Sequence, residues 1–377
     1  DSPTSLSQAR SYLRSPMTSA TPKVLIVGAS GLVGSAAATA FARAGWQVLT
    51  ASRRTPDWID GAFQHFSLDL DDPDSILPVI AQHPDLTHLV YTAVFELPGL
   101  VAGWSDPSQI ARNGDWFDQL LTRLLDQTAL THVTLLQGTK AYGASVQPMR
   151  VPAREDQPRV EHPNFYWLQE DRLKKASEAS GLTFTILRPQ LIVGPNQGVV
   201  MNLPPVIGAY AALRRAEGLP FSFPGGADWV WEAVDVRLVA NACVWAANHP
   251  GAVNQTFNLT NGEVFLWRDL WPALADVLDI DTGPDEPLDL AIYFSDRIDT
   301  WQSLAATHGL IEPNLMRLLG ESHHYANLCF AYGAIASPPP ALVSTIKIKQ
   351  AGFTETHNTE ASFCHWLSVL RDRRFIP

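Results

Sequence analysis

Short runs of apolar residues alternate along the chain with segments whose apolar residues follow a helical spacing. Residues 23–27 form a continuous apolar run, and a second run at 46–51 follows an alanine-rich segment at 35–44. A short continuous run indicates a strand that is buried on both faces, and alanine is the strongest helix former. This part of the chain therefore predicts a strand, a helix and a second strand.

The same alternation continues toward the C-terminus. Further strands are predicted at 63–68, 87–91, 132–136 and 183–187. Helices are predicted at 115–128, 205–217, 267–278, 298–307 and 361–371. The alternation of strands and helices predicts an α/β fold with a Rossmann-like, doubly wound parallel sheet, in which ligands bind at the carboxyl ends of the strands.

The later helices predict a smaller, mostly helical C-terminal region that forms an apolar pocket over the sheet. We expect a Rossmann domain that binds the nucleotide at 23–200, with 233–262 returning to the sheet, and a substrate-binding region at 201–232 and 263–377. Residues 1–22 are rich in Ser, Thr and Pro, and we expect a disordered N-terminal segment there or a vector-derived extension ahead of Met17.

Three glycines follow the first predicted strand and open the helix, in the pattern Gly28-x-x-Gly31-x-x-Gly34. Gly28 permits a tight turn, and Gly34 lets the helix pack closely on the strand. Gly31 lets backbone N–H groups approach a pyrophosphate at the positive end of the helix dipole. Because the flanking strand and helix are both predicted, this pattern indicates a dinucleotide site.

The end of the second strand indicates which dinucleotide is bound. NAD-binding sheets usually carry an acidic residue there, but this strand ends in Ser52-Arg53-Arg54. A guanidinium pairs with a 2′-phosphate that a carboxylate would repel, so we predict NADPH/NADP+ with Arg53 as the main contact. Other candidate cofactor contacts lie in the glycine turn and at the later strand ends: Ser30, Leu32, Val33, Asp69, Leu70, Thr92, Ala93, Gln137, Gly138, Pro189 and Ile192.

Composition excludes several classes of protein. The chain has 27 Lys and Arg against 38 Asp and Glu, and this net charge of −11 disfavours a nucleic-acid partner. No apolar run is long enough to span a membrane. Cys243, Cys329 and Cys364 lie far apart, which fits packing residues and a reducing, cytoplasmic setting. Neither these cysteines nor the adjacent His323 and His324 have the spacing of a metal site.

The usual catalytic motif of this sheet type is absent. Related dehydrogenases carry Tyr-x-x-x-Lys on one helix, so that the ammonium lowers the pKa of the phenol, but no tyrosine here has a lysine four positions later. Lys140 follows the fifth predicted strand, and Tyr166 begins the next helix. Because these two ends are neighbours in a doubly wound sheet, we predict that Lys140 and Tyr166 form the pair from separate segments. Tyr142 is a second candidate donor or, equally, a wall residue of the nicotinamide pocket.

Several short motifs accompany this pair in order along the chain. They are Gly-Thr-Lys140-x-Tyr142, Asn-Phe-Tyr166-x-x-x-Glu-Asp, Arg188-Pro189, Met201-Asn202, Phe257-Asn-Leu-Thr-Asn-Gly-Glu-Val-Phe265-x-Trp267 and Ala351-Gly-Phe353. In this combination the chain resembles the progesterone 5β-reductase and iridoid synthase-like group of atypical short-chain dehydrogenases/reductases over residues 23–377. The resemblance implies NADPH-dependent 1,4-reduction of α,β-unsaturated carbonyls, with Tyr166 and Lys140 as the functional pair.

The resemblance also implies the substrate. It places Val200, Met201 and Asn202 in a segment that faces the substrate, and Tyr142 and Phe330 are further candidate contacts. The expected partner is a small apolar carbonyl compound of steroid-like or terpenoid-like character, and a homodimer is compatible with the sequence. The prolines at 338–340 predict a rigid insertion that forms a lid beside the pocket.

Three alternative functions stay open at this point. The first is a carbonyl reductase or epimerase on the same fold, which the missing Tyr-x-x-x-Lys motif disfavours. The second is a redox-neutral cyclase that uses bound NADP only as a scaffold. The third is an NADP-sensing regulator without chemistry, which would need neither Lys140 nor Tyr166.

Overall fold

The computed structural model describes residues 21–377, and the segment predicted to be disordered at 1–22 lies almost wholly outside them. A seven-stranded sheet with the order β3-β2-β1-β4-β5-β6-β9 forms its centre, and every neighbouring pair of strands is parallel. The strands are β1 (Lys23–Val27), β2 (Gln47–Ser52), β3 (Gln64–Ser67), β4 (His88–Tyr91), β5 (His132–Leu136), β6 (Thr183–Pro189) and β9 (Gln255–Leu259). The predicted Rossmann-like sheet is thereby confirmed.

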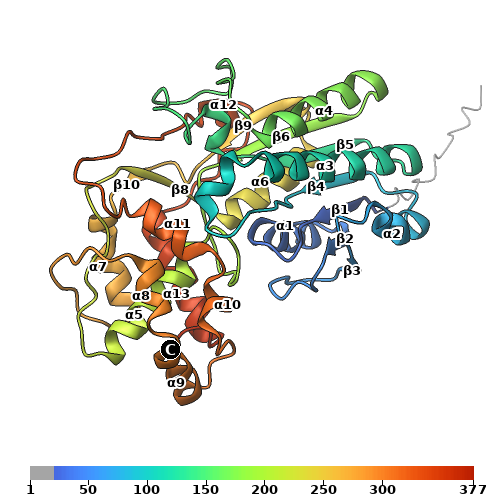
Figure 1. The fold of residues 1–377 in the computed structure, drawn as a ribbon. Coiled ribbons are helices and arrows are strands. Elements are labelled where there is room, and N and C mark those ends of the chain that lie inside the picture. The colour runs from blue at the N-terminus through green and yellow to red at the C-terminus, as the bar shows by residue number, and fades with distance from the viewer. Residues whose placement is uncertain (1–20) are drawn as a thin grey trace, which may run out of the picture.

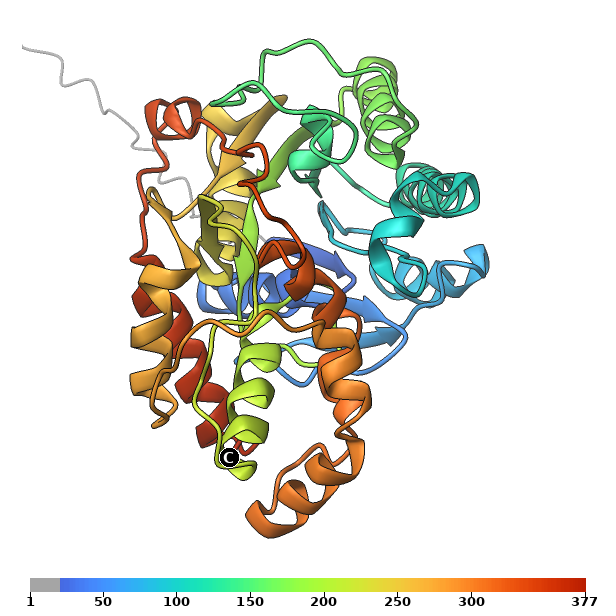
Figure 2. The same ribbon diagram turned by 60° about the vertical axis from the view of Figure 1, so that its left-hand side comes forward.

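Helices cover both faces of this sheet. On one face α1 and α6 pack together, and on the other face α3 and α4 pack together (Figures 1 and 2). The helices of this half are α1 (Leu32–Arg43), α2 (Leu77–Gln82), α3 (Pro107–Gln127), α4 (Phe165–Ser180) and α6 (Val236–Asn248). The side chain of Asp235 caps α6 by accepting from the N–H of Arg237.

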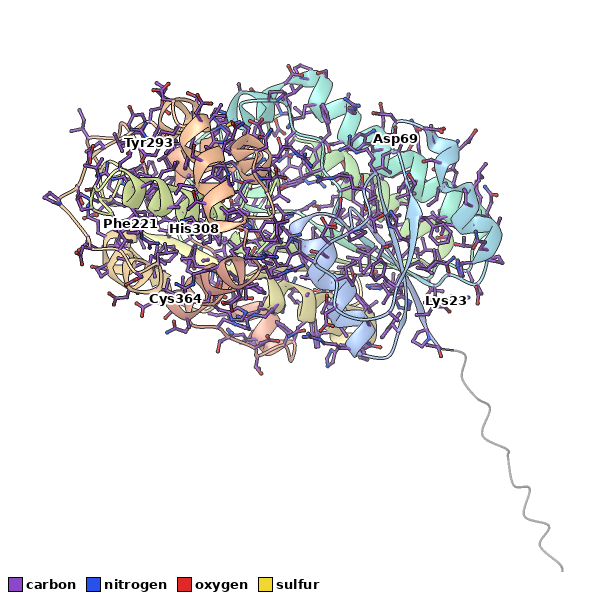
Figure 3. All side chains as sticks on the ribbon, turned by 90° about the horizontal axis from the view of Figure 1, so that it is seen from below. Lys23, Asp69, Phe221, Tyr293, His308 and Cys364 are labelled. Carbon is purple, nitrogen blue, oxygen red and sulfur yellow. The ribbon has the colours of Figure 1, made fainter. Side chains whose placement is uncertain are left out.

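A second half, built mainly from helices, lies beside the sheet (Figure 1). It contains α5 (Leu203–Ala216), α7 (Trp267–Val277), α8 (Leu290–Ser295), α9 (Ile298–His308), α10 (Leu315–Leu319), α11 (Ser322–Cys329) and α13 (Thr359–Asp372). The short helix α12 (Ile346–Gln350) packs instead on β9 of the large sheet. A small sheet of β7 (Leu191–Val193), β8 (Trp231–Asp235) and β10 (Val264–Phe265) joins the two halves. Figure 3 separates the halves, with Phe221 and Tyr293 in the helical one and Lys23 and Asp69 in the other.

Aromatic packing forms the core of the helical half. Phe221 stacks on Trp271 with ring centroids 4.3 Å apart, and Phe330 contacts Trp271 edge-on at 5.7 Å. Trp301 is fully buried in the same cluster. This core is separate from the two apolar layers against the sheet, which contain Phe41 and Phe117. The helical half therefore has a hydrophobic core of its own.

Predicted and observed elements differ most at helix starts. The helix predicted at 115–128 begins at Pro107, because the Asp106 side chain accepts from the N–H groups of Ser108 and Gln109 and so caps it there. The helix predicted at 35–44 begins at Leu32, within the glycine pattern. No side chain caps α1, where Gly31 takes the cap position.

Candidate active site

A cavity of about 870 Å³ lies along the carboxyl ends of the strands, between the sheet and the helical half. Its walls come from the glycine turn, the ends of β2, β4, β5 and β6, and the segment from Gly198 to Met201. Residues of α11 and the prolines Pro338–Pro340 close the other side. This volume belongs to the upper part of the usual range for ligand sites.

The glycine turn fits a dinucleotide. Gly28 has a φ of +86°, and a Cβ there would lie 2.7 Å from Thr92 Oγ1 and 2.8 Å from the backbone nitrogen of Ala93. A Cβ on Gly34 would lie 2.3 Å from the carbonyl oxygen of Gly28, so only glycine lets α1 start this close to the strand. The first turn of α1 therefore presents its N–H groups to the cavity without side chains in front of them.

The predicted cofactor contacts meet in this one cavity. Its lining includes Gly28, Ser30, Gly31, Leu32, Val33, Ser52, Arg53, Arg54, Asp69, Leu70, Thr92, Ala93, Gln137, Gly138, Lys140, Tyr166, Pro189 and Ile192. Gly34 is absent from this lining because it faces the Gly28 turn and serves packing. The ligand roles of these residues stay predictions, but the structure brings them together.

The side chains at the end of β2 leave room for a charged ligand. Arg53 and Arg54 are exposed at the cavity edge, and neither forms an ion pair with a residue in the described range 21–377. Ser52 is buried, and its hydroxyl donates to the carbonyl oxygen of Arg54 at 2.7 Å. This bond holds the turn while both guanidinium groups stay available for an anion.

Asn164 joins the two segments that carry Lys140 and Tyr166. Its side-chain oxygen accepts from the N–H of Tyr166 at 3.0 Å and so caps α4. Its amide nitrogen donates to the carbonyl oxygen of Lys140 at 3.1 Å. A Cβ on Gly138 would lie 3.3 Å from the Tyr166 hydroxyl oxygen, so this phenol reaches the end of β5.

The charges around Tyr166 differ from those of the predicted pair. Burial raises the pKa of the phenol, the Glu96 carboxylate raises it further, and only the Arg188 guanidinium lowers it. Within residues 21–377, no hydrogen bond joins Lys140 to Tyr166. The expectation that Lys140 lowers the pKa of this phenol is therefore wrong, because the ammonium points to another partner.

That partner is Glu96, which the sequence analysis missed. Lys140 Nζ lies 3.6 Å from Glu96 Oε1 and 4.0 Å from the centre of the Trp104 ring. Glu96 and Trp104 both line the cavity. The available signal was the position of Glu96 in the loop directly after the fourth strand, where the carboxyl end of a parallel strand delivers ligand-side residues.

A buried network of Arg188, Gln137 and Glu170 is hydrogen-bonded to the backbone of Tyr166. Arg188 donates to Gln137 Oε1 at 2.9 Å and to Glu170 Oε2 at 3.2 Å, and all three side chains are buried or nearly so. Gln137 Nε2 lies 3.3 Å from the carbonyl oxygen of Tyr166 and donates to it. Because the charges are paired inside the protein, the network fixes α4 against β5 and β6.

Three predicted contacts lie outside the cavity lining and are corrected here. Tyr142 is buried, and its hydroxyl donates to Asn258 Oδ1 at 2.6 Å. Asn202 is fully buried, and its amide donates to the carbonyl oxygens of Gly194 and Asn196 at the start of α5. Phe330 packs in the aromatic core of the helical half. Each was predicted from neighbouring motif residues, and Val200 and Met201 from the same prediction do line the cavity.

The proline segment lies over the cavity, where Pro338–Pro340 and Ala341 form part of the lining. Trp229 Nε1 donates to the carbonyl oxygen of Pro339 at 3.1 Å, and Glu232 Oε2 accepts from the N–H of Val343 at 2.8 Å. Gln190 also donates to the carbonyl oxygen of Ala341. The prolines predicted to form a lid thus line the cavity, and Gln190, Trp229, Trp231 and Tyr325 line it without having been predicted.

Two classes of feature were also searched for in the structure. In the described part of the chain, no group of three or more His, Cys, Asp or Glu side chains is arranged to hold a metal ion. No helix among the same residues combines the length and the apolar character that crossing a membrane requires.

Comparison with known proteins identifies the family. The model of the NAD dependent epimerase/dehydratase family matches residues 24–260. The chain belongs to this family. Its members are NAD(P)-dependent enzymes, so the protein is an oxidoreductase that uses a nicotinamide cofactor.

Relatives and solved structures agree with this assignment. (S)-8-oxocitronellyl enol synthase from Antirrhinum majus is 30% identical, covering 94% of this chain and 92% of its own length, and the enzyme of that name from Catharanthus roseus is 29% identical with the same coverage. The fold is similar to UDP-glucose 4-epimerase from Thermotoga maritima, with a TM-score of 0.65, 16% identity and coverage of 93% and 99%. UDP-glucose 4-epimerase from Thermus thermophilus, in complex with NAD, has a TM-score of 0.64 and 18% identity, with coverage of 93% of this chain and 99% of its own. The predicted resemblance to the iridoid synthase-like group is thus confirmed.

We expect substitution of Gly34 to affect mainly the stability of the fold and substitution of Gly31 to affect mainly dinucleotide binding. Gly34→Ala places a methyl group against the Gly28 carbonyl and should lower the unfolding free energy by about 1–3 kcal/mol. Gly31→Ala meets the same oxygen at a milder 3.2 Å, so it should unfold closer to the parent while binding the dinucleotide more weakly. Thermal unfolding and fluorescence titration with NADPH measure the two effects, and equal unfolding losses in both variants would contradict this reading.

Glu232 gives a pH-dependent stability. Burial raises its pKa to about 7 from the usual 4.5, so the folded state binds a proton that the unfolded state releases. The fold therefore loses stability as pH rises from about 4.5 to about 7, by roughly 2–3 kcal/mol at most. In Glu232→Gln this loss should be absent, so denaturant unfolding between pH 5 and 8 should favour the variant increasingly as the pH rises. A parallel decline in both proteins would refute the assignment.

Proposed function

We propose that this enzyme reduces the C=C bond of α,β-unsaturated carbonyl compounds by 1,4-addition, with NADPH as the cofactor. The observation that carries the proposal is the position of the Tyr166 hydroxyl. It lies beside Gly138 at the end of β5, in the same cavity as the glycine turn. A hydrogen-bond donor is thereby available at the carboxyl ends of the strands, where we expect the nicotinamide to bind.

The choice of NADPH over NADH rests on the end of β2. Arg53 and Arg54 are both exposed at the cavity edge, and no acidic residue replaces them at this strand end. Two guanidinium groups offer paired N–H donors to a 2′-phosphate. The first turn of α1, from Gly31 to Val33, would hold the pyrophosphate, and Asp69 and Leu70 would flank the adenine.

NADPH, when bound, supplies the hydride that adds to the β-carbon of the substrate. The residues of the chain then act on the carbonyl oxygen, where negative charge develops. Because burial raises its pKa, the Tyr166 phenol stays neutral even at a pH above its ordinary pKa. Its O–H therefore donates a hydrogen bond to that oxygen, which a phenolate would repel. A donor of this kind contributes about 2.7–4 kcal/mol to a barrier when it is already oriented.

The rest of the cavity binds an apolar molecule. Val101, Val146, Met149, Trp229 and Tyr325 form much of the wall away from the glycine turn. These side chains give the wall an apolar surface, and the Tyr166 hydroxyl is the donor that we expect to orient a carbonyl. A small apolar enone or enal therefore fits better than a sugar nucleotide, whose hydroxyl groups would lose their hydrogen bonds against these walls.

The named relatives support an enol as the immediate product. They are called enol synthases. Proton transfer from the Tyr166 hydroxyl to a substrate enolate oxygen gives an enol and a phenolate, and a proton from solvent then restores the phenol. A redox-neutral cyclase would leave NADPH unconsumed, so cofactor consumption together with product mass distinguishes the two reactions.

Tyr166→Phe removes the donor and keeps the ring. We expect kcat for an enone such as 2-cyclohexen-1-one to fall about 10²–10³-fold, while the dissociation constant for NADPH changes little. NADPH absorbance and fluorescence titration measure the two quantities. Tyr332→Phe, at an exposed position outside the cavity, is the matched control, and nearly full turnover by the Tyr166 variant would reject the proposed role.

Arg53→Ala and Arg54→Ala test the cofactor preference. Each removes charge-assisted hydrogen bonds to a 2′-phosphate, so binding of NADPH should weaken about 10–100-fold while binding of NADH stays within about twofold. Titration of each protein with both dinucleotides gives the ratio. Arg43→Ala, which breaks an exposed ion pair with Asp60, is the control, and equal weakening of both cofactors would overturn the preference.

A further inference from the structure

The loop between β4 and α3 carries an acidic residue into the cavity. The Glu96 side chain is only 1% exposed, and its Oε2 accepts from Gln109 Nε2 at 2.6 Å. Among residues 21–377, no group forms a hydrogen bond with its Oε1, which lies 3.6 Å from Lys140 Nζ. A buried carboxylate oxygen without a hydrogen bond is costly, so the nearby ammonium is its main compensation.

Helix α3 fixes the direction of Glu96. On one side of it, Asn113 accepts from the N–H of Phe95 at 2.8 Å and donates to its carbonyl oxygen at 2.9 Å. On the other side, Gln109 Oε1 accepts from the N–H of Leu97 at 2.8 Å. The backbone is thus held immediately before and after Glu96, and the bond from Gln109 Nε2 holds the carboxylate itself.

Lys140 depends on this carboxylate for its charge. Its side chain is 16% exposed, and its Nζ lies over the Trp104 ring. Burial lowers the pKa of Lys140, and the Glu96 carboxylate opposes that effect. The pairing is mutual, because burial raises the pKa of Glu96 and Lys140 is the first group that lowers it again.

We propose that Glu96 is a positioning residue that holds Lys140 as an ammonium ion, turned toward the β4–α3 loop, over the cavity. This inference rests on the proposed function for its catalytic meaning. Lys140 then serves as a fixed cation in the cavity, and Tyr166 remains the donor to the carbonyl oxygen. The single helix that usually carries both groups is replaced here by the turn after β5, the first turn of α4 and an acidic residue from a third segment.

The other titratable groups near this pair come from several elements. Tyr166 belongs to α4, Tyr325 to α11, and His162 to the segment before α4, and all three line the cavity. Arg188 of β6 and Glu96 have opposite effects on the Tyr166 phenol, because Arg188 lowers its pKa and Glu96 raises it. Among these groups, only Glu96 carries the negative charge that opposes the effect of burial on Lys140.

Glu96→Gln tests the proposal with the whole chain and without cofactor. The amide keeps the size and the acceptor for Gln109 but removes the charge. Trace labelling with acetic anhydride across a pH series, followed by mass spectrometry, reports the titration of Lys140 by its reactivity. We expect the midpoint to move down by about one pH unit, which makes Lys140 about tenfold more reactive below the midpoint.

Glu321→Gln is the matched control. Glu321 Oε2 accepts from the N–H of Gly99 at 2.9 Å, so it contacts the same loop without touching Lys140. In the Glu321 variant, the titration midpoint of Lys140 should equal that of the parent protein. Glu96→Asp, which keeps the charge but withdraws it by one methylene, should give a smaller downward shift and covers the case in which the amide variant does not fold. An unchanged or raised midpoint in the Glu96 variants overturns the proposal.

Kinetics then separate this inference from the proposed function. If the parent protein reduces enones, Glu96→Gln should lower kcat about tenfold with little change in KM for the enone. If the parent protein reduces no enone, the proposed function fails while the labelling experiment still decides the role of Glu96.

Discussion

The parallel arrangement of the strands is the constraint on which the site depends. In a parallel sheet every strand ends at the same edge, and Val27, Ala51 and Tyr91 are paired in register at that edge. The residues that follow these strands, from the Gly28 turn to Arg53 and Thr92, must therefore meet. Glycine at position 28 satisfies this constraint, because any side chain there would collide with Thr92 and Ala93.

Charge in the interior is managed by pairing across distant segments. Glu96 accompanies Lys140, and Glu170 accompanies Arg188. Each pair compensates a buried cation with a carboxylate. The Tyr166 phenol stays protonated because burial and the Glu96 carboxylate raise its pKa and outweigh the Arg188 guanidinium. This differs from a lysine placed one turn along the same helix, which would act on the phenol directly.

The strands and the glycine turn were predicted from the sequence because the signals are local. A buried strand such as β5 requires a continuous apolar run, and the prediction at 132–136 matches it. Helix starts were less certain, as α3 shows, since the cap at Asp106 outweighs the apolar spacing. Phe330 and Tyr142 were misplaced because an aromatic residue in a motif packs in a core as readily as it lines a cavity.

The sequence by itself determined the class of the sheet, the dinucleotide turn, the basic end of β2 and the pair of segments that carry Lys140 and Tyr166. Only the tertiary structure decided which way the Lys140 ammonium points and that Glu96 and Trp104 receive it. The physical reason is the distance along the chain over which each signal acts. Apolar periodicity and glycine turns act between neighbours in the chain, whereas the partner of a buried charge is chosen by the whole fold.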